Sequence, residues 1–359
     1  MIAQNNIWDN QTFHGRGAQI NPQNRFFKQE RVMEHIEVID EPMLLDDKTE
    51  YLQTFPKTII NKVDSPDLMN LSLNPYQGCE HGCVYCYARN THEFWGYSAG
   101  LDFERKVIVK MNAAELLEKE LSNPRHKAEP MMFSGNTDCY QPIERKLQLT
   151  RKMLEVLLKY RHPAAMITKN SLICRDIDIL ADMAKKNLVH VMISITGMDE
   201  DVRMKLEPRT STYKNRFETL RMLSEAGIRT GILFGPVIPG LNSHEIPEVL
   251  ETARANGARS AGYTMVRLNG QVGDIFRDWL RKSYPDKAEK ILHHIEGAHG
   301  GKVNDTRWGT RMTGEGQMAE SIAKLFKLTA SRLGLNQDTM RWNTQDFNPK
   351  AGAAQLTLF

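Results

Sequence analysis

The chain has 359 residues, of which 41% are hydrophobic and 25% charged, with a net charge of +3 and a pI near 8.5. This composition is typical of a globular protein that buries a sizeable core in one large or two ordinary domains. No apolar run approaches the roughly 18 residues of a membrane span, so a membrane protein is not expected. The mild charge permits a nucleic-acid partner without indicating one.

The N-terminal segment, residues 1–65, is predicted to be a polar arm. Its start, MIAQNNIWDN, lacks the apolar core of a signal peptide, so a cytoplasmic protein is expected. Two roles remain open for the arm: packing on the domain surface, or a basic strap for a phosphate backbone. The adjacent Phe26 and Phe27 indicate that part of it docks. The basic residues in its first 45 positions are Arg16, Arg25, Lys28 and Arg31.

Three of the five cysteines, Cys79, Cys83 and Cys86, lie within eight positions in a C-x3-C-x2-C pattern. Clustered cysteines in a chain without an export signal indicate metal binding, not disulfides. Three thiolates can hold a [4Fe–4S] cluster and leave its fourth iron open for chemistry. A structural zinc ion would need four ligands, and His81 lies inside the loop, where reaching the same metal would be strained. A cluster is therefore predicted, with zinc as the alternative.

Downstream of the cysteines, short apolar runs alternate with amphipathic segments, including a helix expected over Gln141–Tyr160. This alternation predicts βαβ units, a parallel sheet and right-handed crossovers that curl the sheet. With the strand that leads into the cysteine loop, about six βα units are expected. The predicted fold class is α/β, a partial (β/α)6 barrel over residues 66–270. Its further strands are expected at Pro130–Ser134, Ala164–Thr168, Val189–Ile195, Arg229–Phe234 and Ser260–Val266.

Residues 271–343 are predicted to form a helical C-terminal extension, because the strand pattern stops there. The last of its helices carries an apolar stripe that is expected to cover the open side of the barrel. A Gly-rich loop before it contains Arg307 and Arg311, and loops of this composition are mobile or bind ligands; contact with a nucleic-acid phosphate is one hypothesis for both arginines. The helices are expected at Ile275–Lys282, Lys287–His299 and Met318–Leu333.

The cysteine loop, NPYQGCEHGCVYCYAR, has an aromatic residue, Tyr85, directly before its third cysteine, and TDCYQPIER follows downstream. These motifs resemble the radical S-adenosylmethionine (SAM) superfamily, and within it the branch of spore photoproduct lyase. The resemblance covers residues 71–266, with a weaker match near the C-terminus. It implies the same partial barrel, a [4Fe–4S] cluster on the three cysteines, SAM as cofactor, and a 5′-deoxyadenosyl radical that removes a hydrogen atom from the substrate.

The resemblance also implies where SAM is held, at the carboxyl ends of the strands. The amino group of SAM would contact residues 136–138. Its ribose and carboxylate would contact residues after the strand at 189–195 and in the segment around 207–216. Its adenine would contact Tyr85 and the turn at 235–242. A surface ion pair is the alternative for either arginine of the set, and a helix cap the alternative for Asp138. The candidates are Asn136, Thr137, Asp138, Ser194, Thr196, Glu207, Arg209, Arg216, Val237, Ile238 and Asn242.

Cys139 follows a strand end beside this predicted SAM site. Spore photoproduct lyase uses a cysteine near the corresponding strand to return a hydrogen atom to the product radical, which makes Cys139 the candidate catalytic residue. The order here is Thr-Asp-Cys, whereas the lyase places its cysteine first. A buried thiol that acts as a small hydrophobic residue is the alternative, and it is the interpretation that we adopt for Cys174.

Residues 344–359 are predicted to be a flexible tail that ends in Gln-Leu-Thr-Leu-Phe. The pentapeptide resembles the peptide by which bacterial replication and repair proteins bind the sliding clamp. A linker that presents an amide and apolar anchors suits a hydrophobic groove; folding back onto the chain's own core is the alternative. The residues concerned are Gln355, Leu356, Leu358 and Phe359.

Together these features predict a radical SAM enzyme that acts on DNA and repairs a pyrimidine lesion. A flavodoxin or ferredoxin would supply the electrons. The first alternative is a radical SAM enzyme that modifies RNA, a peptide or a small metabolite, with the tail an ordinary terminus. The second is a non-enzymatic iron–sulfur redox sensor.

Overall fold

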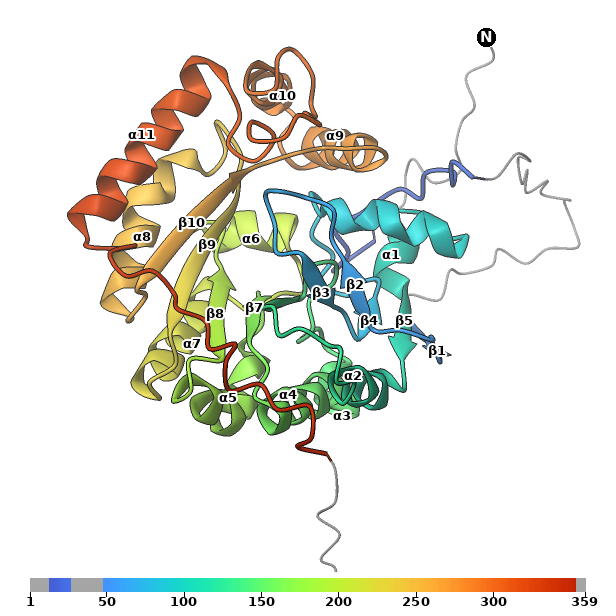
Figure 1. Cartoon of the computed structure of the whole chain (residues 1–359). Coiled ribbons are helices and arrows are strands. Elements are labelled where there is room, and N and C mark those ends of the chain that lie inside the picture. The colour runs from blue at the N-terminus through green and yellow to red at the C-terminus, as the bar shows by residue number, and fades with distance from the viewer. Residues whose placement is uncertain (1–12, 27–47, 353–359) are drawn as a thin grey trace, which may run out of the picture.

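The computed structural model describes residues 13–26 and 48–352, and its centre is a curved seven-stranded sheet surrounded by helices (Figure 1). The strand order is β10-β9-β8-β7-β6-β3-β2, with β2 antiparallel to β3 and every other pair parallel. The strands are β2 (Ile60–Lys62), β3 (Leu71–Leu73), β6 (Met131–Phe133), β7 (Ala164–Thr168), β8 (Val189–Ser194), β9 (Thr230–Val237) and β10 (Ser260–Met265).

The six parallel strands confirm the predicted α/β partial barrel, and the five strands expected after the cysteine loop are all present. The strand sequences are nearly continuous apolar runs, because helices cover one face of the sheet and the opposite face is turned toward the interior of the barrel. In β7, for example, Ala164, Ala165 and Met166 are all buried. The helices between the strands are α2 (Ala113–Leu121), α4 (Leu149–Tyr160), α5 (Ile177–Ala184), α6 (Glu200–Leu206), α7 (Tyr213–Glu225) and α8 (Ile246–Ala255).

A second, smaller sheet was not predicted. It has the order β1-β5-β4, with β1 parallel to β5 and β4 antiparallel to it. Its strand β5 has the sequence KVIVK, and its three central residues are buried. The sheet joins residues that precede the cysteine loop to residues that follow it. Its elements and their neighbours are β1 (Glu50–Thr54), β4 (Tyr76–Gln77), η1 (Tyr87–Trp95), α1 (Leu101–Arg105) and β5 (Lys106–Lys110).

The sequence predicts one helix over Gln141–Tyr160, but the structure contains two helices there, so the prediction of one continuous helix was wrong. Gln148 has φ of 52° and separates α3 (Glu144–Leu147) from α4. The buried carboxylate of Glu144 accepts the amide hydrogen of Thr150 at 3.0 Å and so caps the start of α4. An acidic cap at a helix N-terminus is favourable, but here it comes from the preceding helix, which apolar spacing alone does not reveal.

The C-terminal extension contains α9 (Val272–Ser283), α10 (Ala288–Gly297) and α11 (Gly316–Arg332), close to the expected ranges. Helix α11 packs along α8, and its Phe326 ring lies 4.8 Å from the ring of Tyr263 in β10. The helix therefore lies against the β10 end of the sheet. No helix in the described ranges combines the length and the hydropathy of a bilayer crossing.

Residues of the loop before α11 connect the two ends of the sheet. The amide of Met265 in β10 donates to the carbonyl of Met312 at 2.8 Å. The next-door Arg311 forms an ion pair with Asp67 at 2.8 Å and donates to Ser65 at 2.7 Å, and both of these residues lie between β2 and β3. We call this contact the seam clasp (Ser65, Asp67 and Arg311), because it bridges the edge strands β2 and β10.

Residues 343–352 lie at the amino-terminal side of the strands. The amide of Asn348 donates to the carbonyl of Tyr160, the last residue of α4, at 3.0 Å. Phe347 packs against His126 and His162, with ring centroids 5.5 Å from each. The chain therefore returns across the end of the barrel opposite to the cysteine loop (Figure 1). The predicted clamp peptide, Gln355 to Phe359, lies outside the described residues.

Candidate functional site

The loops at the carboxyl ends of the parallel strands surround a cavity of about 500 Å³. This is the end of a parallel sheet at which ligands bind. Residues from the cysteine loop, from the ends of β6, β7, β8 and β9, and from the segment after β10 line it. The predicted site residues in its wall are Cys79, Cys83, Tyr85, Cys86, Asn136, Thr137, Asp138 and Ser194.

All three cysteines line the cavity, and they are not in disulfides. Cys79 and Cys83 are each 7% exposed. Burial raises the pKa of Cys79 well above its usual value, and it raises the pKa of Cys83 to about 12. Buried thiolates need a positive charge beside them. Metal ions would supply it, so the donor set fits a thiolate-ligated cluster.

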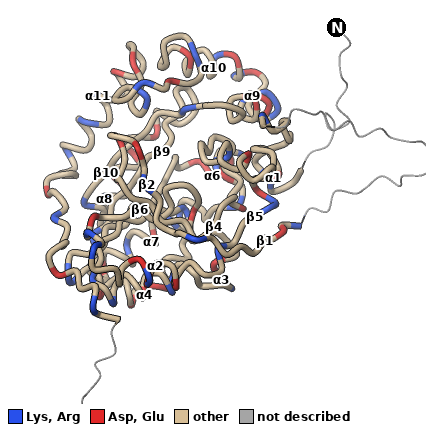
Figure 2. The backbone as a smooth tube through the Cα atoms, turned by 45° about the vertical axis from the view of Figure 1, so that its right-hand side comes forward, with Lys and Arg blue, Asp and Glu red and all other residues tan. Residues whose placement is uncertain are grey.

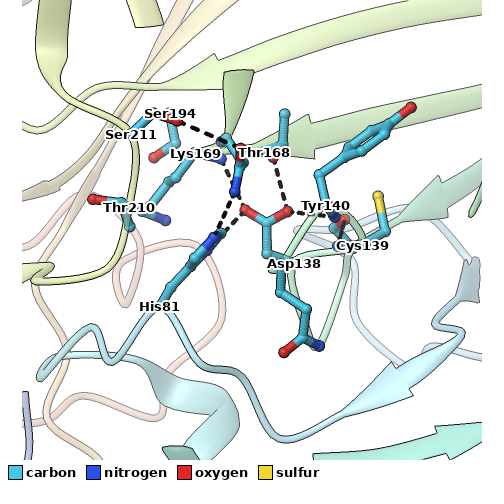
Figure 3. Close-up of polar contacts among 12 residues, drawn as sticks. His81, Asp138, Cys139, Tyr140, Thr168, Lys169, Ser194, Thr210 and Ser211 are labelled. Atoms are coloured by element: carbon cyan, nitrogen blue, oxygen red, sulfur yellow. Dashed lines mark hydrogen bonds and ion pairs between the residues drawn. The ribbon is translucent and has the colours of Figure 1, made fainter. Parts of the chain in front are cut away.

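His81 does not face the cysteines as a fourth ligand. Its Nδ1 lies 3.3 Å from the carboxylate of Asp138 (Figure 3). Its Nε2 lies 3.2 Å from the side-chain amide of Asn170. Both ring nitrogens are therefore engaged with polar partners. This arrangement disfavours the zinc alternative, which depended on His81.

Buried Arg89 fixes the shape of the cysteine loop. Its guanidinium donates to the carbonyls of Gly82 and Cys83 at 3.1 and 2.9 Å, and it pairs with Glu104 at 2.5 Å. Arg89 and Glu104 are fully buried, so each charge depends on the other. Sequence reasoning missed this residue, although it follows the third cysteine by only three positions in the YAR segment.

The N-terminal arm also supports the cysteine loop. The amides of Gly17 and Ala18 donate to Glu104 at 3.1 and 2.8 Å. Gly17 contacts Gly82 so closely that a Cβ built on it would lie 1.6 Å from the carbonyl oxygen of Gly82. Residues 13–26 thus pack on the domain, as the first of the two hypotheses for the arm expects.

Asp138 is the best-connected polar group of the cavity wall (Figure 3). Its carboxylate accepts from the hydroxyl of Thr168 and the amide of Lys169, each at 2.8 Å, and from the amide of Tyr140 at 2.9 Å. Burial alone would raise its pKa, but His81 and these donors outweigh burial and lower the pKa to about 2. The bond to Tyr140 is the local capping contact that was the alternative for Asp138.

Thr137 offers a test of whether SAM fits this wall. Its hydroxyl is buried, lines the cavity near the cysteines, and has no hydrogen-bond partner among the described residues. Buried hydroxyls are normally paired, so this one points to a polar ligand. The neighbouring Asn136 lines the same wall, and its amide donates to Asn74 at 2.9 Å. The wall therefore fits a cofactor with polar groups beside the cluster.

A second buried network lies behind Tyr85. Its hydroxyl donates to Glu207, which also accepts from Thr196 at 3.0 Å and from Arg216 at 2.5 Å. Burial would raise the pKa of Glu207, but the charges of Arg216 and of Lys169 hold it below its usual value. Glu207 is therefore an ion, and its partner Arg216 also donates to the carbonyl of Ser194 at 2.9 Å.

Several predicted SAM contacts thus lie behind the cavity wall instead of in it. Arg216 is fully buried against Glu207, and Arg209 donates to the carbonyl of Gly15 at 2.9 Å. Asn242 joins β8 to β9 through bonds to the carbonyls of Thr196 and Pro236, at 2.7 and 3.0 Å. Residues of the set that do not line the cavity are Thr196, Glu207, Arg209, Arg216, Val237, Ile238 and Asn242.

Cys139 is fully buried and does not line the cavity. Its amide donates to Ser134 at 2.9 Å, and its carbonyl accepts from Thr150 at 2.7 Å. In Figure 3 its sulfur points away from His81 and Lys169. The structure therefore places Cys139 in the core between β6 and α4, where the interpretation as a small hydrophobic residue fits.

The remaining wall is mostly apolar and was not anticipated. It is formed by side chains from β6, β7 and β9, from the segment after β10, and from the loops next to the seam clasp. Its polar members include Tyr87 and Arg267, and the hydroxyl of Tyr87 donates to the carbonyl of Gly135. The apolar members include Leu68, Met69, Met132, Ile167, Leu233, Met265 and Met312.

The family model of the radical SAM superfamily matches residues 73–253, which include the cysteine loop and the four parallel strands β6, β7, β8 and β9. The chain belongs to the radical SAM superfamily. Members of this superfamily use a [4Fe–4S] cluster and SAM. The family therefore confirms the predicted cofactors, and the three cysteines of this chain line one cavity.

An uncharacterised protein of Mycobacterium tuberculosis is 30% identical over 234 residues, which are 64% of this chain and 69% of that protein. An uncharacterised protein of Methanocaldococcus jannaschii is 28% identical over 247 residues, 69% of this chain and 88% of that one. The structure is similar to spore photoproduct lyase complexed with dinucleoside spore photoproduct, with a TM-score of 0.58, 14% identity, and coverage of 79% and 80%. At this identity, the likeness shows the shared fold.

Proposed function

We propose that this radical SAM enzyme acts on DNA and repairs a pyrimidine lesion. The observation that carries the proposal is the cavity, whose lining combines the three cysteines and several polar groups with a set of apolar side chains. Its volume of about 500 Å³ lies in the range of pockets that enclose small organic ligands. The fold shared with spore photoproduct lyase supports the same substrate class.

In this proposal, the cluster, SAM and the substrate occupy different parts of the cavity. Cys79, Cys83 and Cys86 would hold the cluster, and Thr137 and Asp138 would face the amino group of SAM. When bound, the reduced cluster and SAM supply a carbon radical that removes a hydrogen atom from the substrate. The protein contributes position and a dry surrounding.

The apolar wall would take the lesion. Enzymes that act on a base in duplex DNA must first take it out of the stack, and an extruded base gains contacts with apolar and soft side chains. Met132, Leu233, Met265 and Met312 provide such contacts, and methionine adapts its shape to flat ligands. Figure 2 shows basic and acidic positions interspersed along α9, α10 and α11.

Two partners complete the proposal. A flavodoxin or ferredoxin would reduce the cluster, and the peptide Gln355 to Phe359 would bind the bacterial sliding clamp. Residue 352 lies beside Tyr160, at the end of the barrel away from the cavity. A clamp bound to the following residues would therefore leave the cavity mouth free.

The deciding experiment compares SAM cleavage with and without ultraviolet-irradiated DNA. The protein is reconstituted with iron and sulfide under anaerobic conditions and reduced with dithionite, and 5′-deoxyadenosine is measured. We expect irradiated DNA to change the rate of SAM cleavage or the product that is formed from SAM, whereas untreated DNA should change neither. Equal rates of SAM cleavage with irradiated and untreated DNA, together with stimulation by RNA, a peptide or a metabolite pool, would indicate that the substrate belongs to another class.

Clamp binding has its own test. Deletion of the last five residues should abolish binding to purified clamp in a pull-down or by surface plasmon resonance, while SAM cleavage stays unchanged. A matched variant, in which Leu358 and Phe359 alone are replaced by alanine, should behave as the deletion does. Binding that survives both changes contradicts this part of the proposal.

A further inference from the structure

The cavity contains one cation that the cofactor chemistry described above does not use. Arg267 follows β10 by two residues, is half-buried, and lines the cavity beside Met265 and Met312. Among the described residues, its guanidinium has no hydrogen bond and no ion pair. Lys169, the other cation of the wall, lies instead on the cysteine side, with its Nζ 5.8 Å from the ring centre of Tyr85.

The carboxylates nearest to Arg267 are already engaged by other arginines. Asp67 pairs with Arg311 at 2.8 Å in the seam clasp. Asp305 pairs with Arg307 at 2.8 Å and accepts from Thr310 at 3.1 Å. Arg267 therefore lies next to an acidic pair of residues without being neutralised directly by either. Burial and the positive charge of Arg311 lower the pKa of Arg267 from its usual value, yet a guanidinium stays charged.

A half-buried, unpaired guanidinium is costly to keep in an apolar wall. Its five N–H groups form a planar fork that matches two oxygens of a phosphate. An aromatic residue stands close by: Trp308, 52% exposed, stacks against the guanidinium of Arg311, whose carbon lies 3.8 Å from the ring centre. Aromatic and cationic side chains combined in this way are typical of surfaces that bind unstacked nucleotides.

We propose that Arg267 binds a backbone phosphate next to the substrate base and so determines that the enzyme takes nucleotides. This inference rests on the proposed function, because it treats the apolar wall as the substrate wall. It makes Arg267 a specificity-determining residue of the substrate side, distinct from the groups that hold the cluster and SAM. The expected ligand group is one phosphodiester, held at the β10 side of the cavity under the seam clasp.

The experiment measures binding of a fluorescein-labelled, ultraviolet-irradiated single-stranded oligonucleotide to the reconstituted protein. We expect Arg267→Gln to weaken binding about 10- to 100-fold, the loss of one charge-assisted contact. The slope of log K against log salt should fall by about 0.7. Arg259→Gln is the matched control, because Arg259 is exposed at the other end of β10 and away from the cavity.

A neutral backbone identifies the contact. Irradiated TpT with a methylphosphonate linkage should bind the natural protein less well than ordinary irradiated TpT, and the two should bind Arg267→Gln equally. SAM cleavage without oligonucleotide should be the same in both proteins. Arg267→Lys keeps the charge and should lose only part of the affinity, which separates the contact from a folding defect.

The outcomes separate the two proposals. Equal binding by the natural protein and by Arg267→Gln overturns the phosphate contact and leaves the proposed function standing. No binding of any oligonucleotide by the natural protein overturns both. A raised KM for SAM in Arg267→Gln without oligonucleotide assigns the arginine to the cofactor and also overturns the inference.

Discussion

The two walls of the cavity are built in opposite ways. On the cysteine side, buried charges are matched: Arg89 with Glu104, and Arg216 with Glu207, all four of them less than 1% exposed. On the seam side, the wall is apolar, is closed by a partly buried ion pair, and contains the unpaired Arg267. Matched buried charges hold one geometry and tolerate little change. The cysteine side is thus suited to a fixed cofactor, and the seam side to a substrate.

The largest expected effect is on the cysteine side. Replacing Cys79, Cys83 and Cys86 together by alanine should remove bound iron and sulfide and reduce SAM cleavage to background, because each thiolate holds one iron. Iron and sulfide assays and 5′-deoxyadenosine formation measure this. Cys174→Ala is the control, since Cys174 lies on η2 (Ser171–Asp176), away from the cavity wall. Iron and sulfide retained by the triple variant would refute the cluster site.

The buried pair Arg216–Glu207 gives the next largest effect. Arg216→Met leaves Glu207 as an uncompensated buried charge, which costs about 3–5 kcal/mol in the free energy of unfolding. Chemical denaturation measures this change. Arg221→Met, on the same helix but exposed between Glu218 and Glu225, should leave the denaturation midpoint unchanged. Similar effects of the two substitutions would contradict the comparison between matched buried charges and surface ones.

The pH dependence of the same pair has a definite sign. Because folding lowers the pKa of Glu207, the stabilisation by this group is fully present above the pKa of the unfolded chain. It is lost as the pH falls through the lower pKa of the folded state. Unfolding experiments between about pH 3 and about pH 7 should therefore show that the natural protein exceeds Glu207→Gln in free energy of unfolding at neutral pH, and that this difference shrinks in acid. An advantage that grows toward acid would contradict the assignment.

Gly17 tests whether the N-terminal arm belongs to the cysteine side. Gly17→Ala should displace the arm from Gly82 and cost about 1–3 kcal/mol, as overpacking does. The cluster content after reconstitution should fall with it. Gly297→Ala, where no atom lies within 4 Å of the added Cβ, is the matched control. An unchanged melting temperature in Gly17→Ala would show that the arm is not part of this wall.

The sequence predicts the parallel sheet and the cysteine loop well, because both depend on short-range patterns. Apolar runs of four to seven residues recur between amphipathic segments, and three cysteines in eight positions need no tertiary information. The supporting charges are different. Arg216 and Glu207 are nine positions apart and look like a surface pair or a ligand contact in sequence; only the fold shows that they are buried together behind Tyr85.

Arg267 on the seam side and Cys139 near the cysteine side also show what the sequence alone does not predict. Cys139 follows Asp138 directly, yet the chain turns so that one side chain lines the cavity and the other enters the core. Arg267 belongs to no motif. Its role is inferred because it has no counter-ion among the described residues, since Asp67 and Asp305 pair with other arginines. Orientation at a turn and competition for partners are tertiary properties.

Cys139 supplies a smaller effect. Cys139→Ala removes one buried sulfur and should cost about 1 kcal/mol, while SAM cleavage and substrate turnover remain. Cys139→Ser should be less stable than the alanine variant, since a hydroxyl replaces an apolar contact in the core. A by-product that appears only in Cys139→Ala, or a product radical that no longer receives a hydrogen atom in that variant, would support the prediction that the thiol is the hydrogen donor.

The smallest effect is expected on the seam side. Asp67→Asn breaks the ion pair with Arg311 but leaves a polar, similarly sized side chain, and isolated ion pairs of limited burial contribute about 0–1 kcal/mol. The denaturation midpoint should therefore scarcely move, in contrast to the effect of Arg216→Met, which lies behind the cysteine side. Oligonucleotide binding should become tighter, because Arg311 is released next to Arg267 and two guanidinium groups then face the same phosphate. A large loss of stability would show that the seam is as rigid as the cysteine side and would remove the contrast between the walls.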